Sequence, residues 1–204
     1  MTTAARTPAL TLAGTDYHDE AIFALERRNI FHRSWFYVGR ADALQPGDRL
    51  VVAIAGESIL IVCDRERSLH AHANVCRHRG AQLCAESGPG SQGSITCPYH
   101  AFTYALDGRL IATPNVDADE LDRDALGLWS IALEVWEGFV FVSLAERPPP
   151  LLEWFEQHPD SSPLHFGRHD MGNLRVGRRT VAEVEANWKI INENYMECLH
   201  CPRV

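Results

Sequence analysis

Two short segments of the chain each bring one cysteine and one histidine close together. The first holds Cys76 and His78, the second holds Cys97 and His100, and 18 residues lie between the two segments. Thiolate sulfur and imidazole nitrogen are both good ligands for transition metals. Glycine and proline within or beside the two motifs, in CRHRG and CPYH, suit tight loops. The sequence therefore predicts a metal centre held by these four side chains.

The mixture of ligand types favours a [2Fe–2S] cluster over a zinc ion. Zinc also accepts two cysteines and two histidines, but zinc fingers usually pair Cys with Cys and His with His. Four thiolates leave an oxidised [2Fe–2S] core with a charge of about −2, and replacing two of them by neutral imidazoles removes that charge. The reduction potential then rises from about −400 mV to between about −150 and +300 mV. Such a centre suits an electron relay.

A second candidate site lies near the end of the chain. Glu197 and His200 are three residues apart, so on a helix they share one face. Non-haem Fe(II) enzymes bind iron through two histidines and one carboxylate and leave positions open for dioxygen and substrate. Taken alone, the pair is only a weak indication of a metal site, since surface ion pairs with this spacing are commoner. The cluster motif upstream favours the iron site.

The composition limits the classes of partner and location. The 204 residues include 19 basic and 27 acidic side chains, for a formal charge of −8, which argues against nucleic-acid binding. The first 14 residues lack the apolar core of a secretory signal, and no segment has the ~20 apolar residues that span a membrane. Six cysteines without an export signal indicate metal binding in a reducing compartment, so we expect a cytoplasmic protein. Outside the motifs, we expect Cys63 and Cys84 to be small buried side chains, and His70 and His72 to be structural.

The pattern of apolar residues predicts mixed helical and antiparallel β structure. We expect helices at 16–31, 151–155 and 187–199, the first with an apolar side formed by Ile22, Leu25 and Ile30, and the last with one formed by Trp188, Ile191, Tyr195 and Cys198. We expect strands at 50–54, 59–62, 70–75, 102–105, 133–136 and 139–144, with a further strand at 180–185. Three consecutive prolines at 148–150 mark a domain boundary. The predicted division is therefore 1–33, 34–147 and 148–204.

The two Cys/His motifs resemble those of the Rieske iron–sulfur family, with C-x-H on one loop and C-x-x-H on the other. The first loop, CRHRG, is similar to that of ring-hydroxylating oxygenase α-subunits. This resemblance implies an α+β fold, with an antiparallel β Rieske [2Fe–2S] domain and a truncated, helix-grip-like catalytic domain. Respiratory Rieske proteins carry extra loop cysteines and a serine donor, and the corresponding positions of this chain are Ala81, Tyr99 and Phe102. The resemblance therefore implies a cluster potential at the low end of the range.

The segment from Asn187 onward resembles the motif N-W-K-x-x-x-E-N-Y/F-x-E/D-x-x-H-x-x-x-x-H of the same oxygenases. The resemblance implies that His200 is an iron ligand and that Asn194 lines its site. It also implies that Glu197 bridges His200 and the cluster ligand His100 of a neighbouring subunit, in a homotrimer. The second histidine ligand would follow Val204 directly and the carboxylate would lie farther on, so we expect the chain to be a fragment. The rival reading is an electron-transfer protein without its own catalytic iron.

The function implied by the resemblance is that of a terminal oxygenase component. Electrons from NAD(P)H would pass through a flavin or iron–sulfur reductase, or a ferredoxin, to the Rieske cluster, and then to a mononuclear Fe(II) that activates O₂ for hydroxylation. Glutamate at Glu197, within E-C-x-H-C-P, resembles the branch acting on quaternary amines such as glycine betaine or carnitine. Aromatic acids are the alternative substrates. With its iron site incomplete, the chain as given should not hydroxylate anything.

Overall fold

The computed structural model describes residues 11–114, 116, 121–157 and 169–196. Within these residues the α-helices are α1 (Glu20–Glu26), α2 (Leu151–Gln157) and α3 (Trp188–Met196). Short 3-10 turns lie at Gly14–Tyr17, Ala41–Ala43 and Met171–Asn173, and a π turn at Arg27–Phe31. The strands are β1 (Trp35–Arg40), β2 (Asp48–Ile54), β3 (Glu57–Cys63), β4 (Leu69–Ala73), β5 (Gly88–Pro89), β6 (Ser94–Thr96), β7 (Thr103–Ala105), β8 (Leu110–Ala112), β9 (Ala132–Trp136) and β10 (Phe139–Ser143).

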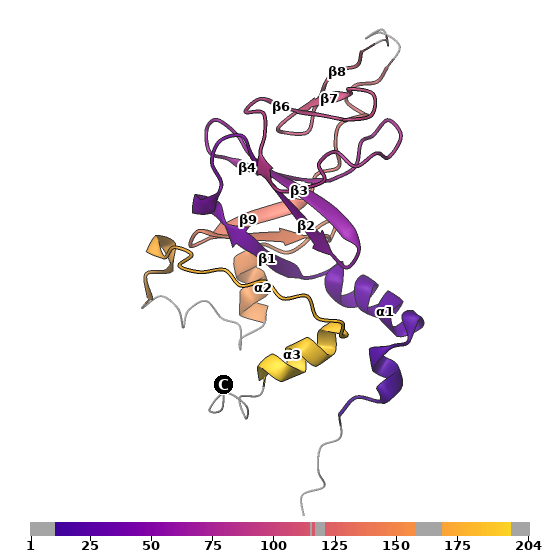
Figure 1. Cartoon of the computed structure of the whole chain (residues 1–204), viewed down its shortest axis with the longest axis vertical. Helices are drawn as coiled ribbons and strands as arrows, with labels where there is room; N and C mark the ends of the chain where they lie inside the picture. The colour runs from indigo at the N-terminus through magenta and orange to yellow at the C-terminus, as the bar shows by residue number, and fades with distance from the viewer. Residues whose placement is uncertain (1–10, 115, 117–120, 158–168, 197–204) are drawn as a thin grey trace, which may run out of the picture.

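The strands form three antiparallel sheets. Their orders are β1-β10-β9, β4-β3-β2-β5 and β6-β7-β8. The sheet β6-β7-β8 lies at one end of the molecule, and α3 lies towards the other (Figure 1). Six of the seven predicted strands are confirmed within one or two residues at each end, and so is the predicted α+β fold with an antiparallel β domain.

Strand β3 organises the core because both of its faces are buried. Leu60 and Val62 point into one apolar cluster with Ile95 and Tyr104. Ile59, Ile61 and Cys63 alternate with them and point into a second cluster. This division follows from the two-residue period of a strand, which sends successive side chains to opposite faces. Burying each large aliphatic side chain contributes about 1.5–3 kcal/mol, so the central strand fixes the register of its neighbours.

The N-terminal α-helix is shorter than the predicted helix at 16–31, and its apolar residues are less buried than the pattern indicated. Helix α1 begins at Glu20, where the carboxylate of Asp19 accepts the backbone N–H of Ala21 at 2.7 Å. Its end widens into the π turn. Leu25 and Ile30, expected on the buried side, are 47% and 39% exposed. The expected apolar face is therefore wrong for these two residues, because the described structure places no core beneath them.

Two expectations for the last part of the chain need correction. The segment at 180–185 is extended but pairs with no strand in the described residues, so the predicted strand is wrong there. Its alternating pattern suits a strand, but a ladder needs a partner. Helix α3 confirms the predicted helix at 188–196, while 197–199 and Cys198 lie outside the described residues. Tyr195 is 80% exposed because the contacts of α3 concentrate in its first turn.

Helix α2 packs directly on the β unit. Phe155 contacts Trp136 and Phe141 edge-on, each with ring centroids 5.7 Å apart. The indole N–H of Trp35 donates to the carbonyl of Pro149 at 2.9 Å. The chain after the three prolines therefore stays in contact with the sheet β1-β10-β9, and the division of the chain at this point remains a prediction. No helix in the described part of the chain has the length and apolarity needed to cross a membrane.

A buried arginine also holds the later segment to the β unit. Arg40, at the end of β1, is 5% exposed, and its guanidinium forms an ion pair with Asp42 at 2.9 Å. Its remaining N–H groups donate to four backbone carbonyls, those of Glu137, Met171, Gly172 and Leu174. The fixed fork of donors on arginine suits several acceptors at once. Arg40 thus ties the segment near 171–174 to the turn between β9 and β10.

Candidate iron–sulfur centre

The two Cys/His motifs form loops with the same hydrogen-bond pattern. In the first, the N–H of Cys76 donates to the carbonyl of Ala81 at 2.8 Å, and the N–H of Gly80 donates back to the carbonyl of Cys76 at 3.0 Å. In the second, Cys97 donates to Phe102 at 2.8 Å and accepts from Ala101 at 3.1 Å. Each loop therefore closes five residues after its cysteine, so two loops far apart in sequence present their ligands alike.

Each loop turns on a left-handed residue four positions after the cysteine. Gly80 has φ of 71° and Ala101 has φ of 55°. Glycine adopts this conformation freely, whereas a residue with a Cβ pays about 1–2 kcal/mol. Glycine in the first loop follows directly from this geometry. Alanine in the second loop is strained.

The structure brings the four predicted ligand residues into two layers. Cys76 and Cys97 are buried, at 3% and 2% exposure, and they line the core beneath the loops. His78 and His100 are exposed, with ring centroids 4.8 Å apart at 68°. Sulfur donors inside and imidazole donors at the surface match the needs of a [2Fe–2S] core with two Cys on one iron and two His on the other.

The donor set fits a two-iron cluster. Both cysteines are free thiols, so their sulfurs are available as ligands. A [2Fe–2S] core asks for two ligands on each iron. The arrangement of two inner sulfurs and two outer rings meets that demand.

The ring of His78 is held by its neighbours. It stacks on Phe102 with centroids 4.4 Å apart and an angle of 4°, while His100 lies against Tyr99 at 3.7 Å. Desolvation, together with the nearby His100 and Arg79, lowers the pKa of His78. Its imidazole is therefore favoured in the neutral form, which is the form that binds metal.

Tyr104 is a site residue that sequence reasoning missed. Its hydroxyl lies 3.3 Å from the sulfur of Cys76 and accepts the backbone N–H of Arg77 at 3.1 Å. A cysteine sulfur bound to a cluster is a thiolate and can only accept, so with the cluster in place the hydroxyl would donate to it. Burial and the bond to Cys76 raise the pKa of Tyr104, so it stays a donor. The pairing of β6 with β7 brings Tyr104 into the core beneath Cys76, a contact across 28 residues that no local motif signals.

Asn74 and Arg77 fix the first loop from both sides. The buried Asn74 side chain donates to the carbonyl of Cys84 at 2.7 Å and accepts its N–H at 2.9 Å. Arg77 donates to the carbonyl of Gly127 at 3.0 Å and lies 4.1 Å over the ring of Trp129. These contacts immobilise the backbone around Cys76. Neither residue was predicted as part of the site.

The remaining predicted cysteines and histidines have structural surroundings. Cys63 is buried at 1% exposure, as expected, while Cys84 is only partly buried. His72 is 2% exposed and its Nε2 lies 2.8 Å from the carbonyl of Leu106. His70 lies 2.9 Å from a carboxylate oxygen of Asp64, in a partly exposed pair. The structural interpretation of both histidines agrees with these contacts.

The candidate iron site is only partly visible. Asn194 lies exposed on α3, and Glu197 and His200 lie outside the described residues. Helix α3 itself is held against α1 through contacts from Trp188 and Lys189, and Asn187 contacts Tyr17 in the 3-10 turn before α1. Sequence reasoning placed Trp188 on the apolar side of the helix but gave Asn187 and Lys189 no structural role.

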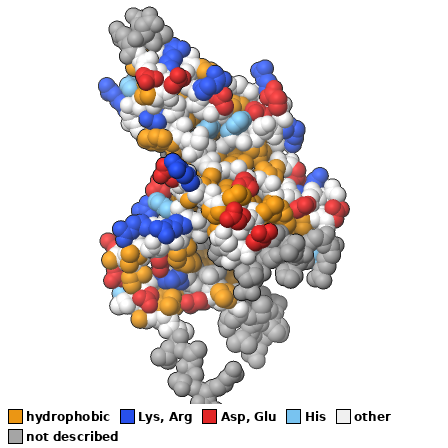
Figure 2. Space-filling view, turned by 180° about the vertical axis from the view of Figure 1, so that it is seen from behind, with side chains coloured by type: hydrophobic (Ala, Val, Ile, Leu, Met, Phe, Trp, Pro, Cys, Tyr) orange, Lys and Arg blue, Asp and Glu red, His pale blue; other side chains and the backbone are white. Residues whose placement is uncertain are grey.

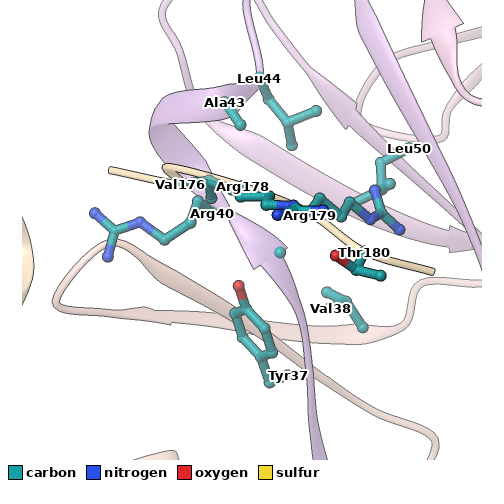
Figure 3. A pocket seen from close by; sticks show the side chains of 11 residues that line it. Tyr37, Val38, Arg40, Ala43, Leu44, Leu50, Val176, Arg178, Arg179 and Thr180 are labelled. Atoms are coloured by element: carbon teal, nitrogen blue, oxygen red, sulfur yellow. The ribbon is translucent and has the colours of Figure 1, made fainter. Parts of the chain in front are cut away.

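The surface supplies two further observations. Figure 2 shows acidic and basic side chains interspersed on one face, so the charge of −8 is not gathered there into one patch. A cavity of about 510 Å³ lies between the β1–β2 region and the segment at 176–180 (Figure 3). Its lining includes Tyr37, Leu50, Arg178 and Arg179, and none of the four cluster-ligand candidates.

The sequence profile of one family covers the site. The Rieske [2Fe-2S] domain profile matches residues 34–136, which is half of the chain, and it spans both Cys/His loops. The chain therefore belongs to the Rieske [2Fe–2S] domain family. The profile of the ring hydroxylating alpha subunit catalytic domain matches residues 171–204.

Curated relatives narrow the comparison. The chain is 37% identical over 186 residues to the glycine betaine monooxygenase oxygenase subunit of Chromohalobacter salexigens, covering 91% of this chain and 41% of that one. It is 34% identical over 195 residues to the carnitine monooxygenase oxygenase subunit of Acinetobacter pittii, covering 95% and 52%. The apo crystal structure of the quaternary ammonium Rieske monooxygenase CntA superposes with a TM-score of 0.82 at 34% identity, covering 94% and 55%. The chain spans about half the length of these relatives, and it matches their N-terminal part.

Proposed function

We propose that this chain forms the electron-receiving half of the oxygenase component of a Rieske monooxygenase that acts on a small quaternary amine. The observation that carries the proposal is the pair of matching loops, with buried sulfurs and exposed imidazoles. The names of the relatives support the substrate class, since they act on glycine betaine or carnitine. Aromatic acids remain the alternative substrates.

In this proposal Cys76 and Cys97 bind the inner iron, and His78 and His100 bind the outer iron. The bound cluster would store one electron at a time. Tyr104 would donate a hydrogen bond to the sulfur of Cys76, and the core beneath the loops would exclude water from both sulfurs. Because the imidazole rings of His78 and His100 are exposed, an electron would pass between the cluster and a partner through these rings. The residues of the chain would thus orient the cluster and determine where electrons enter and leave it.

The second half of the proposal concerns the catalytic iron. Asn194 would line that site, His200 would be a ligand, and Glu197 would accept N–H groups from His200 and from His100 of a neighbouring subunit. The sheet carrying the second cluster loop and helix α3 lie towards opposite ends of the chain (Figure 1), which supports a bridge between subunits rather than within one. Such a bridge requires head-to-tail assembly, which closes as a ring. A homotrimer is the proposed form.

The proposed setting completes the electron path. The donor would be a flavin or iron–sulfur reductase or a ferredoxin supplied by NAD(P)H, O₂ would be the oxidant, and the location would be the cytoplasm. For the domains we propose 34–147 as the Rieske unit, with 1–33 and 148–204 both belonging to the catalytic domain. The contacts between α1 and α3 support the assignment of the N-terminal segment.

The cluster is tested by metal analysis of the chain itself. After anaerobic purification we expect about two irons and two sulfides per chain and a rhombic EPR signal on reduction. Cys97→Ser or His78→Ala should abolish the signal, because the loss of one ligand opens the cluster to water. Cys63→Ser is the matched control, since this cysteine lies outside both loops, and it should retain the signal. A colourless protein with one zinc per chain would refute the proposal.

The catalytic half is tested in a subunit extended through its complete catalytic domain. Glycine betaine and carnitine should be hydroxylated, whereas benzoate should not; the reverse preference would favour the aromatic alternative. The chain as given should accept electrons without hydroxylating any substrate. Glu197→Gln should retain the cluster and iron but lose turnover, because the amide replaces one of the two acceptor oxygens with an NH₂ group, which cannot accept an imidazole N–H. Normal turnover in that variant would make Glu197 an ordinary surface carboxylate.

A further inference from the structure

A carboxylate from the N-terminal segment meets the first turn of α3. Glu26, the last residue of α1, has a side chain only 11% exposed. One of its oxygens accepts the indole N–H of Trp188 at 2.9 Å, and the other accepts from the ammonium of Lys189. Both donors lie in the first turn of α3, so a single carboxylate contacts two consecutive residues of that helix.

The pairing accounts for a buried lysine. Lys189 is 8% exposed, and lysine is almost never buried unless it is paired. Burial raises the pKa of Glu26, but the bonds from Lys189 and Trp188 outweigh that effect and hold the pKa below its ordinary value. Glu26 is therefore ionised near neutral pH. Removing one partner of such a pair leaves a buried charge uncompensated, which is strongly unfavourable.

Other contacts extend this joint in both directions. The side-chain amide of Asn187 donates to the carbonyl of Tyr17 at 2.8 Å, and the Tyr17 hydroxyl donates to Glu193 at 2.8 Å. Phe31 contacts Trp188 edge-on at 5.3 Å and stacks on Phe36 at 5.7 Å. Phe36 belongs to β1, the first strand of the β unit. A continuous set of contacts therefore runs from the Rieske unit through α1 to α3.

The polar contacts set the orientation of α3 because apolar packing at the joint is limited. Phe23, Leu25 and Ile30 near α1 are each 39–47% exposed, and Ile190 on α3 is 45% exposed. Apolar contact is non-directional, so the aromatic packing of Trp188 alone would leave the helix free to rotate or slide. The two hydrogen bonds to the Glu26 carboxylate are directional and buried, and together with the bonds of Asn187 and Glu193 to Tyr17 they restrain the rotation of the helix and its position along the axis.

From this joint we infer that Glu26 is a positioning residue for the candidate iron site. It orients α3 relative to the Rieske unit, and it thereby places Asn194 on that helix. This inference rests on the proposed function for its catalytic consequence. Its geometric content concerns only the described residues.

The geometry is tested in the chain itself by pulsed EPR. A spin label at the exposed position 192, introduced as Asn192→Cys in a background with Cys198→Ser and Cys201→Ser, reports its distance from the reduced cluster. We expect a narrow distance distribution in the parent and at least a twofold broader one in Glu26→Gln and in Trp188→Phe. Hydrogen exchange of α3 amides should accelerate on the order of 100-fold in Glu26→Gln. Glu57→Gln is the matched control, since it breaks only the exposed ion pair with Arg27.

The outcomes separate this inference from the proposed function. Distance distributions as narrow as the parent's in both variants would overturn it. If Glu26→Gln fails to fold, Trp188→Phe decides alone, because phenylalanine keeps an aromatic ring at this position and removes the indole N–H. In the extended subunit we expect kcat to fall about 10-fold to 100-fold with unchanged KM and cluster potential; unchanged kcat would overturn the catalytic consequence. An unaltered subunit without any turnover would refute the proposed function and leave the distance result standing.

Discussion

Replacing Tyr104 by phenylalanine removes one hydroxyl from beneath the proposed cluster and keeps the ring that fills the core. The hydroxyl oxygen lies 3.3 Å from the sulfur of Cys76, and it accepts the backbone N–H of Arg77. A hydrogen bond to sulfur stabilises the more negative, reduced state more than the oxidised state. We therefore expect Tyr104→Phe to lower the reduction potential of the cluster.

The magnitude follows from the strength of the bond. A hydrogen bond to a charged group contributes about 1.5–3 kcal/mol in total. If about a third to a half of that is gained only on reduction, the difference is about 1 kcal/mol. For a one-electron couple, 59 mV corresponds to about 1.4 kcal/mol, so the expected decrease is about 40 mV. The variant should also lose about 1 kcal/mol of stability, because the N–H of Arg77 loses its acceptor.

Protein-film voltammetry on the parent and the variant measures the change. Tyr99→Phe is the matched control, since Tyr99 is an exposed tyrosine on the second loop whose ring lies against His100. It should leave the potential unchanged. An unaltered potential in Tyr104→Phe would show that the hydroxyl does not donate to the sulfur. The expected low potential of this branch is tested in the same experiment, because a parent potential near the top of the Rieske range would contradict it.

Three further predictions concern stability. Ala101→Gly should stabilise the protein by up to about 1 kcal/mol, measured by urea unfolding, because glycine removes the strain of φ at 55°. Burial lowers the pKa of His72 in the folded protein, so below about pH 6.5, the ordinary pKa of histidine, the unfolded chain binds a proton more readily than the folded one. The contribution of neutral His72 to the free energy of unfolding is therefore fully present above that pH and is lost as the pH falls. His72→Gln should make the free energy of unfolding depend less on pH in this range. Arg40→Leu should cost about 3 kcal/mol or more, because it removes the buried partner of Asp42 and the donor to the carbonyls of Glu137 and Met171, and leaves Gly172, Leu174 and Asp42 with only the exposed Arg175.

Each of these has an outcome that would contradict it. Destabilisation by Ala101→Gly would mean that the contacts of the alanine methyl group stabilise the fold by more than the strained backbone conformation destabilises it. An acid dependence that persists unchanged in His72→Gln would assign it to the carboxylates. For Arg40, the control is Arg109→Leu, which breaks an exposed pair with Asp107 and should cost less than about 1 kcal/mol; equal losses in both variants would remove the special role of the buried arginine.

The sequence by itself determined the local features of this protein. Each cysteine ligand candidate has its histidine two or three residues further along the chain, in the pairs Cys76/His78 and Cys97/His100. This spacing alone predicts a mixed-ligand metal centre. Gly80 marked the first turn, the β-rich runs at 50–54 and 59–62 marked β2 and β3, and the alternation at 70–75 marked β4. These features follow from neighbours along the chain. They need no knowledge of what lies across the fold.

Only the tertiary structure decided the contacts between distant segments. Tyr104 reaches Cys76 because β6 and β7 pair, and Glu26 meets Lys189 across more than 160 residues. The expected strand at 180–185 failed for the same reason in reverse, since alternation is a property of the segment while a ladder needs a second strand. Leu25 and Tyr195 show apolar periodicity but stay exposed, because burial depends on what packs against a helix face. The periodicity of a segment shows which side chains can share an apolar face, whereas the tertiary structure determines whether another element packs against that face.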